Sequence, residues 1–192
     1  MSNLSSHALH TDQSADPGSG SFGPEGEEER IVAELQLLGI QYLTRRTSNQ
    51  AERVRSADIL LADLVRQPSA RVRTAVIAVL LAHPEYADGV TRALKRLNPS
   101  ERRTLRFFYT AAVLLQREHA ERLPSAASGQ WLPNRFADEL ALPTSATIKE
   151  QLVALGQRHR QQTHTYINWL GTYENVVHHL LRSWELEARW SQ

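Results

Sequence analysis

Residues 49–83 read NQAERVRSADILLADLVRQPSARVRTAVIAVLLAH, and this stretch decides the fold. Its first half carries apolar residues at steps of three and four, the spacing that places side chains along one side of a helix. These residues are Val54, Ala57, Leu60, Leu61, Leu64 and Val65. Pro68 cannot continue that helix, because proline has no amide hydrogen and disfavours a helical residue before it. The sequence therefore predicts two helices joined at Pro68, the first of them capped by Asn49 and Glu52.

The second half of the stretch, from Ala75 to Ala82, is apolar on nearly every side, as expected for a helix buried among neighbours. Together the two halves resemble one unit of a HEAT-type helical repeat, with a leucine-rich helix, a proline turn and Val-Arg-x-Ala opening an inner helix. The residues that carry this resemblance are Leu60, Leu64, Pro68, Val72, Arg73, Ala75, Ala78 and Leu80. The resemblance implies an irregular HEAT-like layer and a tendency to bind partners. It implies no catalytic chemistry.

The composition is that of a globular protein. The 192 residues are 41% hydrophobic and 22% charged, which is enough for one buried core. There is no cysteine, so disulfides and thiolate metal ligands are excluded. Met1 is followed by polar residues, so we expect no secretory signal, and the longest apolar run, 75–82, is too short to cross a membrane. We therefore expect a soluble, cytoplasmic protein.

Charge is distributed unevenly along the chain, although the formal net charge is only +1. Residues 1–44 contain one arginine and seven acidic residues, whereas residues 45–106 contain 13 basic and six acidic residues. Residues 107–192 contain eight of each. A basic middle region therefore stands beside an acidic N-terminal region.

We predict two regions, a disordered tail over 1–26 and one α-helical domain over 27–192. The tail is rich in Ser, Gly, Asp and Pro and has almost no apolar residue to bury. It spells GxGxxG at 18–23, but no strand precedes this pattern and glutamates follow it, so we do not predict a dinucleotide site. The domain should be all-α, with about seven helices and a long C-terminal helix.

Start signals and periodicity place the other helices. The first is expected over 27–46, with glutamates at its start, where the helix dipole favours negative charge. Another begins at Pro84. The pattern Asn98-Pro99-Ser100-Glu101 starts a helix that should reach Leu123, and Thr147 with Glu150 starts one that should end near Gln162.

The C-terminal part contains a loop-rich connection, 124–146, in which we predict a short helix over 134–140. The last helix, 165–190, carries an aromatic stripe that is typical of a core rather than of a cofactor site. The stripe consists of Tyr166, Trp169, Leu170, Tyr173, Val177, Leu180, Leu181, Trp184 and Ala188. Gly171 interrupts it, either to admit a neighbouring helix or as a kink.

No group of residues predicts catalysis, a metal or a cofactor. The four histidines at 159, 164, 178 and 179 are not spaced to share one helix face, and Glu174 with His178 is most simply a solvated pair. The sequence has no nucleophile elbow and no cysteine nucleophile. We therefore predict a non-enzymatic protein without a cofactor.

The basic middle region has a direct physical consequence. Stacked helices would bring several of its cations onto one rim, which would attract an acidic protein segment or nucleic-acid phosphates. The alternative is an ordinary solvated face, or one that the acids of residues 1–44 neutralise. The candidate binding residues are Arg71, Arg73, Arg92, Lys95, Arg96, Arg102, Arg103 and Arg106.

Trp131 and Phe136 form a second candidate surface, because large apolar residues are unusual in a loop-rich connection. They either pin the connection to the core or serve as a docking knob for another chain. Our leading hypothesis is a helical adaptor that binds another protein through the basic rim or through this segment. The alternative is a nucleic-acid-binding protein that uses the basic face of residues 45–106.

Overall fold

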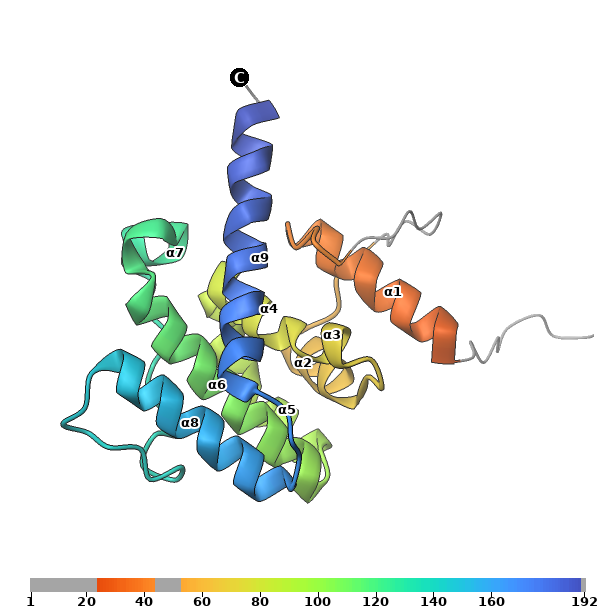
Figure 1. Ribbon diagram of the computed structural model, residues 1–192. Coiled ribbons are helices and arrows are strands. Elements are labelled where there is room, and N and C mark those ends of the chain that lie inside the picture. Colours follow the sequence, from red (N-terminus) through yellow and green to blue (C-terminus); the bar gives the residue numbers. More distant parts are fainter. Residues whose placement is uncertain (1–23, 44–52, 191–192) are drawn as a thin grey trace, which may run out of the picture.

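The apolar run forms α4 (Ala75–Ala82), which lies in the middle of the helical body (Figure 1). The structure is a computed structural model and describes residues 24–43 and 53–190. Every side chain from Ala75 to Leu81 is buried, because α2 (Ala57–Arg66), α6 (Pro99–Glu118) and α9 (Trp169–Trp190) all pack against this helix. Burial on all sides leaves no position for a polar face, which accounts for the uninterrupted apolar sequence.

The helices around α4 stack in two rows. In one row α2 packs against α5 (Val90–Arg96), and in the other α4 packs against α6; the turn η1 (Pro84–Gly89) leads from α4 to α5. Helix α8 (Ile148–Thr163) covers α6, and α9 crosses α8, α4 and α6 (Figure 1). The aromatic and aliphatic side chains between these helices form one continuous core.

Helices are the only regular secondary structure within residues 24–43 and 53–190, which confirms the predicted all-α class. Three elements are short: α3 (Ala70–Arg73), α7 (Pro124–Ala127) and the 3-10 turn η2 (Ala120–Arg122). The predicted hinge at Pro68 is confirmed, because α2 ends at Arg66 and α3 begins after Ser69. The predicted long C-terminal helix is α9.

Two predicted capping boxes are present. In α6 the Asn98 side chain accepts a hydrogen bond from the backbone amide of Glu101 at 2.9 Å. The Glu101 carboxylate in turn accepts one from the backbone amide of Asn98. Thr147 and Glu150 make the same reciprocal pair at the start of α8. Each box satisfies two amides that a helix start leaves without partners. Helix α6 nevertheless ends at Glu118, and the predicted remainder to 123 contains η2.

The first helix is shorter than predicted at its C-terminal end. Helix α1 (Pro24–Leu37) begins before the predicted start at 27 and ends well before 46. Gly39 follows with φ +72°, and the amides of Gly39 and Ile40 donate back to Gln36 and Leu35, which closes the helix in a Schellman motif. The prediction overlooked this glycine stop. Most of the predicted tail, 1–26, and the Asn49–Glu52 cap lie outside the described residues.

Helix α2 begins later than predicted, after Ser56, so Val54 precedes the helix. The preceding backbone has another partner, because the Arg55 amide donates to a carboxylate oxygen of Glu34 on α1 at 3.1 Å. Glu34 itself is only 2% exposed. A tertiary contact thus draws residues 53–56 toward α1 and out of the helix.

The predicted helix over 134–140 is wrong. Residues 136–140 make a single turn, in which the Leu140 amide donates to Phe136 O at 2.9 Å. Ala141 then takes φ +47°, and the Leu142 amide donates back to Ala137 O, which ends the turn. One turn with an immediate left-handed stop cannot propagate into a helix.

The last helix begins at Trp169 rather than at 165, so Tyr166 does not belong to the buried stripe and is 96% exposed. The Asn168 side chain accepts a hydrogen bond from the Gly171 amide at 3.1 Å and acts as the cap. A Cβ on Gly171 would clash with this cap, because it would lie 2.7 Å from Nδ2 of the Asn168 side chain. The close approach of two helices occurs instead at Gly156 of α8, where a Cβ would lie 3.0 Å from the Leu170 nitrogen.

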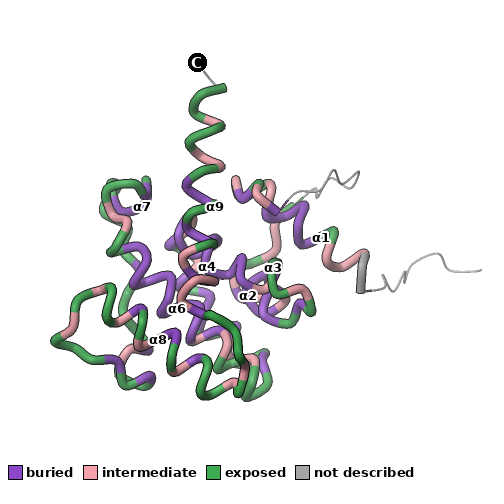
Figure 2. Tube along the Cα trace, viewed as in Figure 1, coloured by how far each residue is buried: buried purple, intermediate pink, exposed green. Residues whose placement is uncertain are grey.

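The C-terminal end of α9 extends beyond the other helices (Figure 1). The middle of the helix is buried, whereas its last turns are exposed or half-buried (Figure 2). Ala188, predicted to be in the core stripe, is exposed, and Trp190 is 83% exposed. The periodic stripe therefore continues past the point at which the core ends.

Within the described residues no helix is both long enough and apolar enough to cross a membrane.

Candidate functional site

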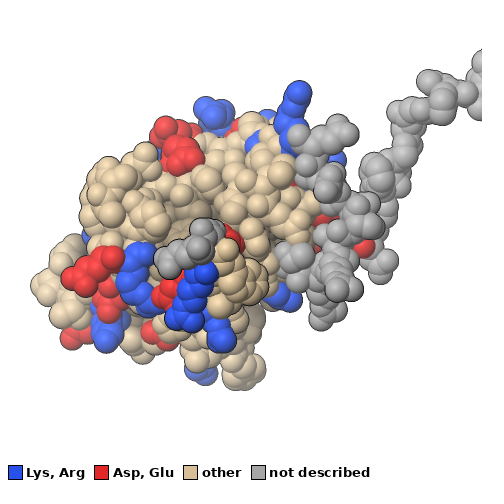
Figure 3. All heavy atoms as spheres, turned by 90° about the horizontal axis from the view of Figure 1, so that it is seen from above, with Lys and Arg blue, Asp and Glu red and all other residues tan. Residues whose placement is uncertain are grey.

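The eight candidate cations lie on α3, α5 and α6 and differ in what their side chains contact. On the face seen in Figure 3, lysines and arginines are interspersed with acidic side chains and leave a large uncharged surface between them. Seven of the eight candidate residues fall into three groups, whereas Lys95 makes no ion pair within the described part of the chain. One group is paired with carboxylates, another with backbone carbonyls, and a third surrounds a hollow.

Arg92 and Arg96 belong to the paired group. Arg96 Nε lies 2.9 Å from Asp58 Oδ2, and Arg92 Nε lies 4.0 Å from Asp58 Oδ1. The Ser56 hydroxyl also donates to Asp58, at 2.9 Å. The hydrogen bonds from Ser56 and then Arg96 outweigh burial and lower the pKa of Asp58. These two arginines hold the start of α2 against α5.

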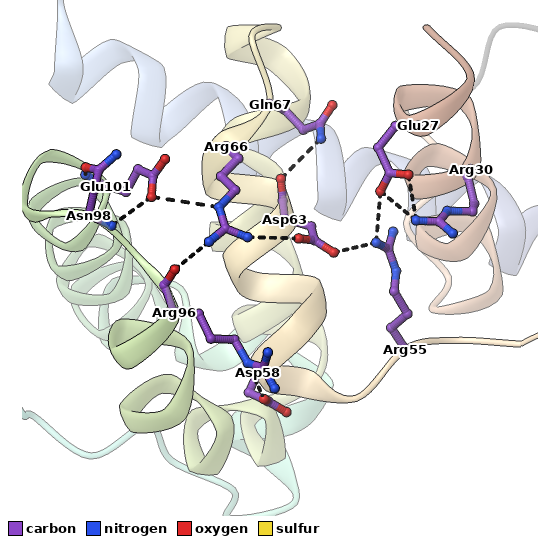
Figure 4. Close-up of polar contacts among 10 residues, drawn as sticks. All are labelled: Glu27, Arg30, Arg55, Asp58, Asp63, Arg66, Gln67, Arg96, Asn98 and Glu101. Atoms are coloured by element: carbon purple, nitrogen blue, oxygen red, sulfur yellow. Dashed lines mark hydrogen bonds and ion pairs between the residues drawn. The ribbon is translucent and has the colours of Figure 1, made fainter. Parts of the chain in front are cut away.

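A larger ion network crosses α2 from α1 toward α6 (Figure 4). Arg55 contacts Glu34 at 2.8 Å, Glu27 at 2.9 Å and Asp63 at 2.5 Å, and it thereby joins α1 to α2. Burial would raise the pKa of Glu27, but its hydrogen bonds with Arg30 and Arg55 outweigh this and lower it.

Arg66 continues the same network toward α6. Its guanidinium contacts Asp63 at 3.4 Å and Glu101 at 3.8 Å and donates to the backbone oxygen of Arg96. Sequence reasoning counted Arg55 and Arg66 as part of the basic face and missed these partners. The one available signal was Glu34, a carboxylate inside the apolar pattern of α1 between Ile31 and Leu35.

Three of the remaining cations, Arg71, Arg73 and Lys95, do not line a shared hollow with the others. Arg71 donates to the backbone oxygen of Tyr42, and Arg73 donates to that of Gln67 at 3.0 Å. Lys95 is exposed and makes no ion pair within the described part of the chain. Lys95 lies on α5 with the paired Arg92 and Arg96, whereas Arg71 and Arg73 lie on α3.

Arg102, Arg103 and Arg106 come together around a hollow of about 370 Å³, which we call the arginine pocket. Its walls come from the first turns of α6, from the loop before α8 and from the C-terminal end of α8. The lining residues are Pro99, Arg102, Arg103, Arg106, Glu139, Leu140 and Gln162. The spacing of the arginines places them on adjacent positions of one helix surface.

Each arginine of the pocket is anchored through part of its guanidinium. Arg102 Nε donates to Leu94 O at 2.7 Å, and Arg103 Nη1 donates to Gln162 O at 2.8 Å. Arg106 Nε lies 3.1 Å from Glu139 Oε2. A guanidinium has five N–H groups, so each side chain keeps donors for a further acceptor. Three cations against one carboxylate leave the pocket with a positive charge.

The segment from Trp131 to Phe136 is divided between the core and the surface. Phe136 is 8% exposed and packs edge-to-face on Tyr109 at 5.2 Å, so it pins the connection to the body. The Tyr109 hydroxyl donates to Pro133 O at 2.8 Å, and burial raises the pKa of Tyr109 to about 12. Of the predicted docking pair, only Trp131 is exposed, at 50%. Trp131 and Phe136 therefore do not form one docking surface.

Phe136 also connects this segment to the arginine pocket. The Arg106 guanidinium lies 5.9 Å from the centre of the Phe136 ring, a cation–π distance. Glu139 and Leu140, which follow in the chain, line the pocket. The two surfaces predicted separately thus meet at Arg106.

The histidines are dispersed. His159 is buried between the rings of Phe107 and Trp169, at 4.2 and 3.7 Å, and its Nδ1 lies 2.6 Å from the Tyr173 hydroxyl. Burial lowers the pKa of His159 to about 3. His178 meets the ring of His119, whose pKa burial lowers. Among the described side chains, no group of three or more His, Asp or Glu could hold a metal ion.

Comparisons of this chain with protein-family models, with curated proteins and with solved structures found no match. The arginine pocket is therefore interpreted from its own geometry.

Proposed function

We propose that this protein is a helical adaptor that binds an acidic segment of another protein at the arginine pocket. The observation that carries the proposal is the convergence of three guanidiniums, each with unused N–H donors, around one hollow. Carboxylates and phosphate groups are the acceptors that fit guanidiniums best, because they take two parallel hydrogen bonds from one arginine. A short acidic or phosphorylated segment would supply such groups.

The distribution of the other cations favours a protein segment over nucleic acid. Binding along a phosphate backbone needs several cations that follow the strand. Here Arg55, Arg66 and Arg96 face carboxylates of their own chain, and Glu139 stands at the edge of the pocket. A compact charged hollow suits one or two anionic groups better than a long polyanion.

The resemblance to a HEAT-type repeat supports an adaptor role. Neighbouring repeats stack so that corresponding helices touch. The contacts of α2 with α5 and of α4 with α6 follow this scheme, with α2 and α4 as one helical pair and α5 and α6 as the next. On this proposal α1, α8 and α9 act as caps that cover the apolar ends of a two-unit stack.

Affinity capture from the native cell tests the proposal with two matched variants. The pocket variant is Arg102→Gln/Arg103→Gln/Arg106→Gln. The control is Arg53→Gln/Lys95→Gln/Arg117→Gln, which removes the same charge from exposed positions. We expect one partner to be recovered with the wild type and the control, and its affinity to fall at least about tenfold with the pocket variant.

Two results would contradict the proposal. One is a partner that the pocket variant binds as tightly as the control does. The other is an eluate whose absorbance shows nucleic acid without a stoichiometric protein, with an affinity that falls steeply as salt is added. Circular dichroism of both variants checks that the helical fold is retained.

A further inference from the structure

The arginines of the arginine pocket use only part of their hydrogen-bonding capacity within the protein. Arg102 and Arg106 use Nε, for a backbone oxygen and for the carboxylate of Glu139. Both therefore keep their two terminal amino groups. Arg103 uses Nη1, for the backbone oxygen of Gln162, and keeps Nε and Nη2. Together the three guanidiniums keep more N–H donors than the two oxygens of one carboxylate can accept.

These guanidiniums are open to solvent and are also held in position. Arg102 and Arg103 are exposed, and the Arg106 side chain is 37% exposed. The backbone oxygens anchor the first two, while Glu139 and the ring of Phe136 contact the third. Side chains that are already held lose less conformational freedom when a ligand binds. A ligand can therefore approach from solvent and meet donors that are already placed.

The lining of the arginine pocket has a net charge of +2, from three arginines and one carboxylate. The helix dipoles do not set this charge, because the positive end of α6 and the negative end of α8 both reach the pocket, at Pro99 and Gln162. A single carboxylate would neutralise only half of the charge. A phosphorylated side chain carries a charge of about −1.5 to −2 at pH 7 and three strong acceptor oxygens. It matches the pocket in both respects.

The same count separates a phosphorylated protein from nucleic acid. Each phosphate group in an RNA or DNA backbone is a diester, with one negative charge and two free oxygens. The phosphate of a phosphorylated side chain is a monoester, which has a third free oxygen and the second charge. Pro99 and Leu140 add apolar wall for the carbon atoms that carry this phosphate. The pocket therefore suits a phosphomonoester on a protein better than a backbone diester.

We propose that the arginine pocket binds a phosphorylated residue of the partner, so that phosphorylation of the partner switches the adaptor on; this rests on the function proposed above. The phosphate oxygens accept hydrogen bonds from the free amino groups of Arg102 and Arg106 and from Arg103. Glu139 keeps its contact with Arg106 at the edge of the pocket. An unmodified serine, threonine or tyrosine brings no charge, so the dephosphorylated partner lacks these contacts.

An NMR titration of the full chain tests the proposal with small probes of defined charge. The probes are N-acetyl-O-phosphoserine amide, N-acetylglutamate amide and dimethyl phosphate, which is a diester. We expect the phosphoserine probe to shift the arginine side-chain signals of the pocket. It should bind at least about tenfold more tightly than either singly charged probe. The pocket variant should lose this binding, whereas the control variant with the same charge should keep it.

Two outcomes of the titration would overturn the proposal. One is a glutamate or diester probe that binds as tightly as the phosphoserine probe. The other is a phosphoserine probe that binds the pocket variant and the control variant alike.

Phosphatase treatment of the native-cell extract before affinity capture supplies a second test. We expect the wild-type protein to recover its partner from the untreated extract but not from the treated one. A partner that survives phosphatase, but that the pocket variant does not bind, would overturn the phosphate proposal and leave the adaptor function standing. A partner that the pocket variant binds as tightly as the control does would contradict the adaptor function itself.

Discussion

The arginines on the two sides of the molecule differ in what they face, although the sequence presents them alike. On the α1–α2 side, Arg55 and Arg66 meet carboxylates from other segments and hold helices together (Figure 4). In the arginine pocket, Arg102 and Arg103 meet backbone oxygens, which leave their charge uncompensated. A cation keeps its full charge for a partner where no carboxylate of its own chain lies within reach. The comparison predicts large stability effects on the first side and small ones on the second.

The largest effect is expected for Arg55→Ala. It leaves Glu34, which is 2% exposed, as a buried carboxylate without its cation, and this should lower the free energy of unfolding by about 4 kcal/mol. Urea unfolding measures the change, with Arg53→Ala at an exposed neighbour as the control. The double variant Arg55→Met/Glu34→Leu should recover most of the loss. A loss below about 1 kcal/mol in the single variant would show that the network is not structural.

His159 is buried and uncharged in the folded protein, so we also expect the stability of the protein to depend on pH. Native His159 stays unprotonated down to a pKa of about 3, whereas unfolded histidine binds a proton near its ordinary value. The unfolded state therefore gains more protons as the pH falls, and stability is lost below pH ~6.5. Between pH 7 and pH 4 the loss from this group should be about 3 kcal/mol by urea unfolding.

The matched control for that pH dependence is His159→Phe/Tyr173→Phe, which removes the histidine together with the hydroxyl that faces it. The variant should lose most of the slope between about pH 6 and pH 5. His119, whose pKa burial also lowers, contributes in the same direction in both proteins and remains as background. An unchanged slope would place the titrating group elsewhere.

An intermediate effect is expected for Arg96→Ala. Asp58 would lose its 2.9 Å contact, but Arg92 and the Ser56 hydroxyl remain near it, and half of the Arg96 side chain is exposed. We expect a loss of about 1 kcal/mol in urea unfolding. A loss as large as that of Arg55→Ala would remove the distinction between buried and half-exposed pairs.

The smallest effect on stability is expected for single Gln substitutions at Arg102 and Arg103. Each removes one hydrogen bond to a backbone oxygen at the surface, so unfolding should change by no more than about 0.5 kcal/mol. Partner binding should fall at the same time. If either substitution instead costs more than about 2 kcal/mol, the pocket is part of the structural network, and the comparison with Arg55 fails.

The local signals in this chain were sufficient for the fold class and for the start of the helix that carries the pocket arginines. The Asn98 and Thr147 capping boxes predicted two helix starts, and the i, i+4 spacing placed Arg102 beside Arg106. They were not sufficient for the wall that Glu139 and Gln162 provide, since these residues come from segments far along the chain.

What the sequence determined by itself is therefore whatever depends on neighbours within a few residues. It determined the all-α class, the burial of α4, the hinge at Pro68 and the two capping boxes, because helix periodicity and capping act over a turn or two. The tertiary structure decided where helices stop against other segments, as at Arg55, and how far the core reaches along α9. It also decided which arginines find a carboxylate, because ion pairing depends on distance in space and not on separation along the chain.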